Sequence, residues 1–104
     1  MTYSVVKRYH TEDDERAARL VRERIGEIDY NDWYKLQNVE TALAGTLAVV
    51  GDSAQSKRKH VEKVVTELFK TTFAGIKSID RPDIHVAIFV ETLERVIEFS
   101  IKGS

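Results

Sequence analysis

The sequence predicts an α+β fold of order β-α-α-α-β-β, with three helices packed on a small antiparallel sheet that includes a C-terminal β-hairpin. Apolar residues recur at helical spacings through most of the chain, whereas near its two ends they alternate or form dense β-branched runs. A length of 104 residues fits one domain, which we assign to residues 1–104. Because an isolated hairpin is only marginally stable in water, we expect the N-terminal strand to join it in one sheet, with the helices on one face.

The composition excludes several classes of protein. The chain has 16 Lys and Arg, 17 Asp and Glu, a formal net charge of −1 and no cysteine. It therefore offers no disulfide scaffold, thiolate metal site or thiol nucleophile, and it lacks the global basic field typical of phosphate-binding proteins. The apolar run at 42–50 is too short for a membrane span, and the first residues do not resemble a secretory signal. We expect a cytoplasmic protein with no membrane partner.

The first predicted elements are a strand over Tyr3–Tyr9 and a helix from Glu12 to Glu27. The strand residues alternate and are rich in β-branched and aromatic types. Thr11 can accept a hydrogen bond from the unpaired amides at the helix start, where the acidic residues that follow also favour the helix dipole. A competing interpretation makes 16–25 a second strand, but helical spacing of the apolar residues argues against it. That apolar stripe consists of Ala17, Ala18, Val21, Ile25 and Ile28.

Two further helices are predicted in the middle of the chain. Asn31 is the best N-cap for a second helix over Asp32–Val50, and Gly51 suits the position after its end. Ser53 offers the next cap, and the third helix is expected to end at Gly75. The apolar positions at helical spacing are Leu36, Val39, Leu43, Leu47 and Val50 in the second helix, and Val61, Val64, Val65, Leu68, Phe69 and Phe73 in the third.

A loop over Ile76–Asp83 precedes the predicted C-terminal hairpin. Its strands are expected at Ile84–Val90 and Arg95–Lys102. The turn near Thr92-Leu93-Glu94 lacks an Asn-Gly or Asp-Gly pair, so its loop length stays open. In the last strand, apolar residues expected to face inward alternate with polar residues expected to face outward. The inward set is Ile97, Phe99 and Ile101, and the outward set is Glu98, Ser100 and Lys102.

No motif for catalysis or metal binding stands out in the sequence. The histidines lie in no metal-ligand spacing such as H-E-x-x-H, the serines sit in no nucleophile elbow, and the scattered glycines form no phosphate-binding loop. We therefore predict no catalytic residue, no metal and no cofactor, and expect that the protein is not an enzyme. A small enzyme of unrecognised type, with acid–base residues around His10 or His85, is kept as a second alternative.

Two features indicate a protein partner for a small non-enzymatic interaction or regulatory protein. Tyr30, Trp33 and Tyr34 cluster at the start of the predicted second helix, and such aromatic residues are enriched at interfaces, although they also close helix corners. The first hairpin strand is apolar on both sides, because Ala87 and Phe89 lie opposite the face formed by its other apolar residues. A strand of this kind needs cover on both faces, and homodimerisation through the sheet or its edge is the simplest way to supply it.

A basic cluster supports the alternative of a nucleic-acid-binding regulator. Its residues fall in the first turns of the third helix, where positive charge is unfavourable, so the cluster can mark an anion site or simply a solvated helix face. A DNA-reading helix-turn-helix is excluded, since Lys57 and His60 would occupy its buried apolar positions. Arg19 and Arg22 add basic residues on the first helix. The predicted anion-binding set is Lys57, Arg58, Lys59, His60, Arg19 and Arg22.

Overall fold

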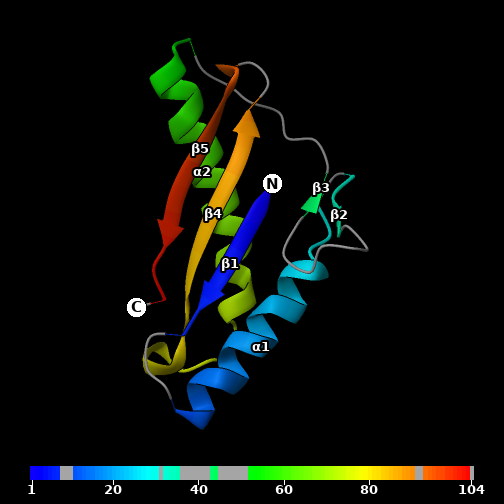
Figure 1. Ribbon diagram of the computed structural model, residues 1–104, viewed down its shortest axis with the longest axis vertical. Helices are drawn as coiled ribbons and strands as arrows, with labels where there is room; N and C mark the ends of the chain where they lie inside the picture. The colour runs from blue at the N-terminus through cyan, green and yellow to red at the C-terminus, as the bar shows by residue number, and fades with distance from the viewer. Residues whose placement is uncertain (8–10, 31, 36–42, 45–51, 91–92, 104) are drawn as a thin grey trace.

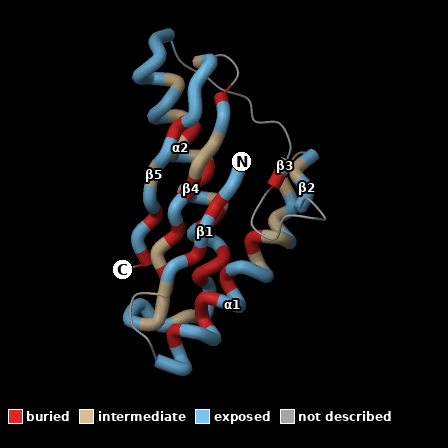
Figure 2. Tube along the Cα trace, viewed as in Figure 1, coloured by how far each residue is buried: buried red, intermediate tan, exposed pale blue. Residues whose placement is uncertain are grey.

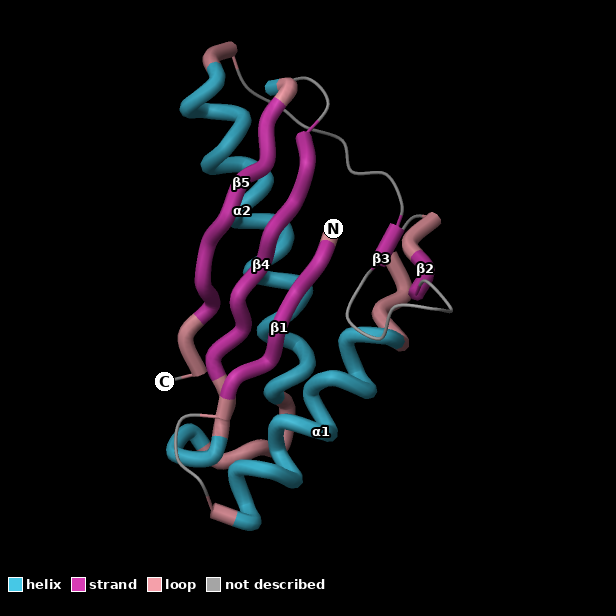
Figure 3. Tube along the Cα trace, viewed as in Figure 1, coloured by secondary structure: helices cyan, strands magenta, loops and turns pink. Residues whose placement is uncertain are grey.

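The computed structural model describes residues 1–7, 11–30, 32–35, 43–44, 52–90 and 93–103 of the chain. Figures 1 and 3 show its strands, its α-helices and two short 3-10 turns. They are β1 (Thr2–Val6), α1 (Glu12–Gly26), β2 (Tyr34–Lys35), β3 (Leu43–Ala44), α2 (Ala54–Lys70), η1 (Thr71–Phe73), η2 (Ser78–Asp80), β4 (Asp83–Val90) and β5 (Arg95–Ile101).

The main sheet is antiparallel, with strand order β1-β4-β5. Its central strand β4 pairs with β5 to form the terminal hairpin, and with β1 from the other end of the sequence. Helix α2 lies behind β4 and β5 in Figure 1, and α1 runs alongside β1. Buried residues of both helices, including Val21 and Phe69, pack in one core with Val86 of the sheet. The α+β class, the hairpin and the addition of the N-terminal strand are therefore confirmed, and the helices cover one face as expected.

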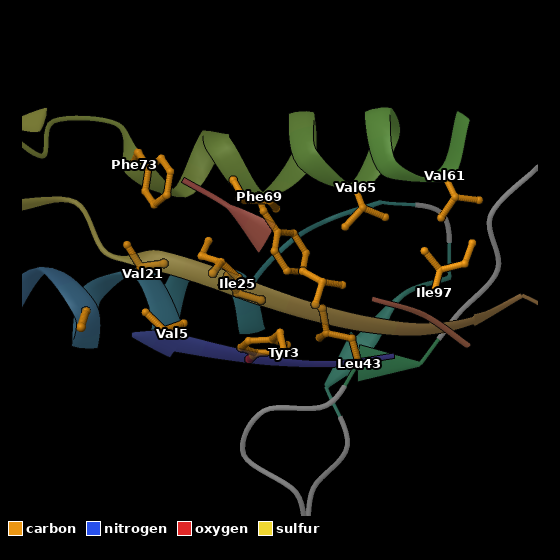
Figure 4. Close-up of a cluster of buried hydrophobic side chains, with 14 of the residues drawn as sticks. Tyr3, Val5, Val21, Ile25, Leu43, Val61, Val65, Phe69, Phe73 and Ile97 are labelled. Atoms are coloured by element: carbon orange, nitrogen blue, oxygen red, sulfur yellow. The ribbon is translucent and has the colours of Figure 1, made fainter. Parts of the chain in front are cut away.

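The core lies between the sheet and the two helices (Figure 2). Alternation on the strands sends Tyr3 and Val86 inward from neighbouring positions of β1 and β4. The Tyr3 ring meets Phe69 of α2 edge-on, with ring centroids 5.8 Å apart, and Ile25 of α1 joins the same cluster (Figure 4). In the last strand Ile97 is buried, in agreement with the predicted inward set.

Helix α1 follows its sequence prediction closely. Thr11 is the N-cap, and its hydroxyl accepts a hydrogen bond from the Asp14 amide at 3.1 Å. Val21 and Ile25 on the predicted apolar stripe are fully buried. The interpretation of 16–25 as a strand is therefore wrong.

The predicted second helix over Asp32–Val50 is wrong where the structure describes it. Tyr34–Lys35 and Leu43–Ala44 form instead a small antiparallel pair, β2 and β3, so the described residues contain two α-helices rather than three. Leu43 is buried and exchanges two backbone hydrogen bonds with Met1, at 3.0 and 3.1 Å. This non-local pairing with the start of β1 decides its conformation, because tertiary contacts override helical spacing. Residues 36–42 and 45–51 lie outside the described part of the chain.

The predicted third helix corresponds to α2 and is shorter at its end. Ser53 caps it as expected, because its hydroxyl accepts from the Ser56 amide at 3.1 Å. The helix ends at Lys70 rather than at Gly75, and the next three residues form the 3-10 turn η1. Thr71 and Thr72 donate their hydroxyls to the Leu68 and Phe69 carbonyls at 2.6 and 2.5 Å, respectively. Such local side-chain hydrogen bonds compete with continuation of the helix.

The predicted loop at 76–83 contains the 3-10 turn η2, which its sequence did not indicate. Strand β4 begins one residue earlier than expected, at Asp83, and β5 ends at Ile101 rather than at Lys102. In the described part of the turn between them, Glu94 has a positive φ of 52°.

Candidate interaction surfaces

The outer face of the sheet, opposite the helices, carries an exposed apolar pair. Phe89 of β4 and Val96 of β5 are directly opposite each other in the strand register. They are 60% and 57% exposed, respectively. The predicted outer apolar side of β4 is therefore present, and its Phe89 ring is not covered by the helices. Val96 was not singled out from the sequence, although its alternation with buried Ile97 could have indicated it.

The other end of the outer face is polar. Ser4, His85 and Ser100 form one cross-strand row, in which His85 Nδ1 and Ser100 Oγ are 2.6 Å apart. This row lines a shallow hollow, and Glu98 of β5 lines it as well. Both hydrogen-bonded side chains are exposed on a strand surface, which is the geometry of an ordinary cross-strand pair. His10, the other histidine of the enzyme alternative, lies outside the described residues.

The aromatic cluster predicted to bind a partner is divided between two environments. Tyr30 and Trp33 stack edge-on, with ring centroids 5.3 Å apart, and Trp33 packs against the core. Tyr34 lies on β2 and is 60% exposed. The three residues do not begin a helix, because β2 stands where that helix was expected. Tyr34 is thus the most accessible member of the predicted partner-binding set.

The basic residues at 57–60 differ in exposure and in contacts. Arg58 Nε lies 3.1 Å from Glu62 Oε1, and its Nη2 donates to the Glu98 carbonyl on β5 at 3.4 Å. Lys57 and His60 are half-buried, and Lys59 is exposed. Arg58 therefore forms a hydrogen bond between α2 and β5. Because two of the four residues are half-buried, the four do not form one exposed patch.

The arginines of α1 have separate roles. Arg16 lies 3.4 Å from Asp13 and 3.7 Å from Glu12, whereas Arg24 donates to the Thr72 and Ala74 carbonyls at 2.9 and 2.6 Å. The remaining two line a hollow between α1 and β1, together with a lysine that was not predicted from the sequence. The hollow is lined by Val5, Val6, Lys7, Glu15, Ala18, Arg19 and Arg22.

The groups in this hollow are partly paired. Lys7 Nζ lies 2.8 Å from Glu15 Oε1, and Arg22 Nη2 donates to the Val5 carbonyl at 3.2 Å. Burial raises the pKa of the nearby Tyr3 hydroxyl above its usual 10.0, and the positive charge of Arg22 opposes part of that rise. Arg19 and Arg22, both named from the sequence as anion-binding candidates, line this same hollow. Lys7 could be found only once β1 was placed beside α1.

Within the described ranges, no group of three or more His, Asp or Glu side chains is arranged to hold a metal ion. None of the helices in those ranges combines the length and apolar character that crossing a membrane requires. Comparison of the chain with protein-family models, with curated proteins and with solved structures found no match to any of them.

Proposed function

We propose that the protein is a small non-enzymatic interaction or regulatory protein of the cytoplasm, which acts through a protein partner and associates as a homodimer by the outer face of its sheet. The observation that supports this proposal is the Phe89–Val96 pair. An exposed aromatic ring directly beside an exposed aliphatic side chain is a compact apolar spot on a face that also carries the polar row of Ser4, His85 and Ser100.

A second copy of the chain fits this face by symmetry. We consider two copies whose outer sheet faces meet, related by a two-fold axis that lies between the sheets and runs parallel to the strands. This arrangement places the Phe89–Val96 pair of one copy against the Phe89–Val96 pair of the other. Face-to-face packing of sheets at about 10 Å is a common arrangement, and an isologous contact needs only one self-complementary patch. Full burial of a side chain such as Phe89 contributes roughly 1.5–3 kcal/mol, so the pair forms the centre of an interface that the rest of the face must extend.

The nucleic-acid alternative finds less support in the contacts of its residues. Arg58 is engaged with Glu62 and with the Glu98 carbonyl, and the formal net charge of the chain is −1. Steep loss of affinity with added salt would nevertheless be its signature, since phosphate contacts release counterions.

The experiment is sedimentation equilibrium of the purified chain and of two variants. Phe89→Ser should raise the dimer dissociation constant by at least about tenfold, because each copy loses a buried ring. Ile79→Ser is the matched control, since Ile79 is 65% exposed but lies on η2. It should leave the dissociation constant unchanged. A wild-type chain that remains monomeric at about 100 μM, well above the concentrations at which specific dimers form, would overturn the homodimer.

A further inference from the structure

The outer edge of β1 is already used for strand pairing at one end. Met1 and Leu43 exchange hydrogen bonds in both directions, which is the pattern of a narrow antiparallel pair. Because backbone groups alternate between the two sides of a strand, those of Val5 point to the same edge as those of Met1. The position of Arg22 agrees with this direction, since its guanidinium meets the Val5 carbonyl at 3.2 Å. The edge of β1 therefore continues from the Leu43 pairing into the hollow beside α1.

The walls of this hollow carry an excess of positive charge. Arg19 and Arg22 lie three residues apart on α1, which puts them on one helix face, and both are exposed. Arg19 forms no ion pair within the described ranges, and Arg22 donates a hydrogen bond to the neutral Val5 carbonyl. Lys7 and Glu15 neutralise each other across the hollow. Two guanidinium groups are thus available to bind carboxylates.

The rest of the lining is apolar. Val5 and Ala18 are buried, and Val6, which alternates with buried Val5 along β1, is 44% exposed. A ligand that suits this lining combines carboxylates with aliphatic side chains. In an extended peptide these can alternate, because successive side chains point to opposite faces of a strand.

The charges around the hollow favour a peptide over a nucleic acid. The first turn of α1 beside it carries Glu12, Asp13, Asp14 and Glu15, with Arg16 paired to two of them. A polyphosphate backbone that entered the hollow would be repelled by this acidic turn, whereas a short segment with one or two carboxylates can avoid it. A strand edge also offers backbone hydrogen bonds, which a peptide can use and a phosphate chain cannot.

We infer that the hollow between the β1 edge and α1 binds an extended acidic segment of a partner protein, with its carboxylates on Arg19 and Arg22 and its aliphatic side chains beside the exposed Val6. The hollow lies at the β1 edge of the sheet, whereas the Phe89–Val96 pair of the proposed homodimer lies on β4 and β5. The segment would add to the edge of β1 as β3 does at Met1, and would use the mode of recognition in which a peptide extends a sheet.

The experiment measures fluorescence anisotropy of a labelled, C-terminally amidated Val-Glu-Val-Asp-Val peptide titrated with the full chain. The wild-type chain should bind it, and added salt should weaken binding because the contact is between exposed charges. Arg19→Glu should lower the affinity at least about tenfold, since an attractive charge becomes a repulsive one. Arg16→Gln is the matched control: it removes an exposed arginine of the same helix that lies outside the hollow, so the affinity should not change.

Three outcomes would overturn the inference. They are absence of binding by the wild-type chain, equal losses in the Arg19 and Arg16 variants, and tighter binding of a single-stranded oligonucleotide than of the peptide. Phe89→Ser should bind the peptide like the wild type. This variant separates the two proposals, because it removes the homodimer contact and leaves the hollow intact.

Discussion

The Tyr3 side chain belongs to the core and also feels the charge of Arg22, which lines the hollow beside α1. Its ring packs edge-on against Phe69, while its hydroxyl is close enough to Arg22 to be influenced by that charge. Burial raises the pKa of the Tyr3 hydroxyl above 10.0 in the folded chain. The unfolded chain therefore releases this proton at a lower pH than the folded chain does, and folding stability becomes dependent on alkaline pH.

We predict that Tyr3→Phe reduces the alkaline loss of stability. The stabilisation linked to the neutral Tyr3 hydroxyl is complete below the unfolded pKa of 10.0 and is lost as pH rises through the higher folded pKa. Urea unfolding between about pH 9 and about pH 11 should give a shallower decline for the variant than for the wild type. Tyr34→Phe, at an exposed tyrosine, should decline like the wild type. Equal slopes for the wild type and Tyr3→Phe would contradict the prediction.

The arginines show how far a sequence specifies single residues. Arg19 and Arg22 are three residues apart, so they share one face of α1 and line the same hollow. Arg24 belongs to the same sequence pattern, yet it donates to the Thr72 and Ala74 carbonyls of a segment almost half the chain away. The local sequence does not show which arginine binds backbone carbonyls and which lines the hollow. The acceptors of Arg24 are backbone atoms whose positions depend on the whole fold.

Among the elements, those with local signals were predicted and those with non-local partners were not. Thr11 and Ser53 marked the starts of both helices correctly, because a capping hydroxyl acts within three residues of itself. Leu43 has helical spacing to its neighbours but pairs with Met1, a contact that sequence periodicity cannot reveal. The partner-binding assignment for Tyr30, Trp33 and Tyr34 therefore rested on a helix that the described residues do not form.

We predict that the cap of α2 is especially important for its stability. Its first turn contains no acidic residue, whereas that of α1 contains four. Ser53→Ala should lower the free energy of unfolding by about 1 kcal/mol, and Ser53→Asp should raise it by roughly 0.3–1 kcal/mol through the helix dipole. Urea midpoints at constant m-value report both changes. Gln55 is the second residue of α2 and makes no capping contact. Gln55→Ala should therefore leave the free energy of unfolding within about 0.5 kcal/mol of the wild-type value.

At the scale of the whole molecule, one layer of two helices covers one face of one sheet. Such a two-layer arrangement buries most inner positions of its strands and leaves the outer positions to solvent or to another molecule. The alternation of apolar residues predicted which positions face each way. It did not show that the chain has no layer of its own, among the described residues, over Phe89 and Val96, because that depends on where the helices are placed.

We predict a large difference between two phenylalanines of this architecture. Phe69 is fully buried between the layers, so Phe69→Ala should lower the free energy of unfolding by about 3–5 kcal/mol. Phe89→Ala, measured at a dilution where the chain is monomeric, should change it by less than about 0.5 kcal/mol. Thermal unfolding followed by circular dichroism distinguishes these values. Comparable losses in both variants would mean that the outer face is covered within the monomer.

The strand order also determines how the fold would respond to mechanical tension. Strands β1 and β5 flank β4 and both run antiparallel to it, so they run in the same direction on the two edges of the sheet. Tension applied through Met1 and Gly103 would pull the start of β1 and the end of β5 in opposite directions along the strand axis (Figure 1). The hydrogen bonds of both ladders would then share the load in shear instead of opening one after another like a zipper. A small sheet joined in this way would resist stretching along its strands far better than peeling from one edge.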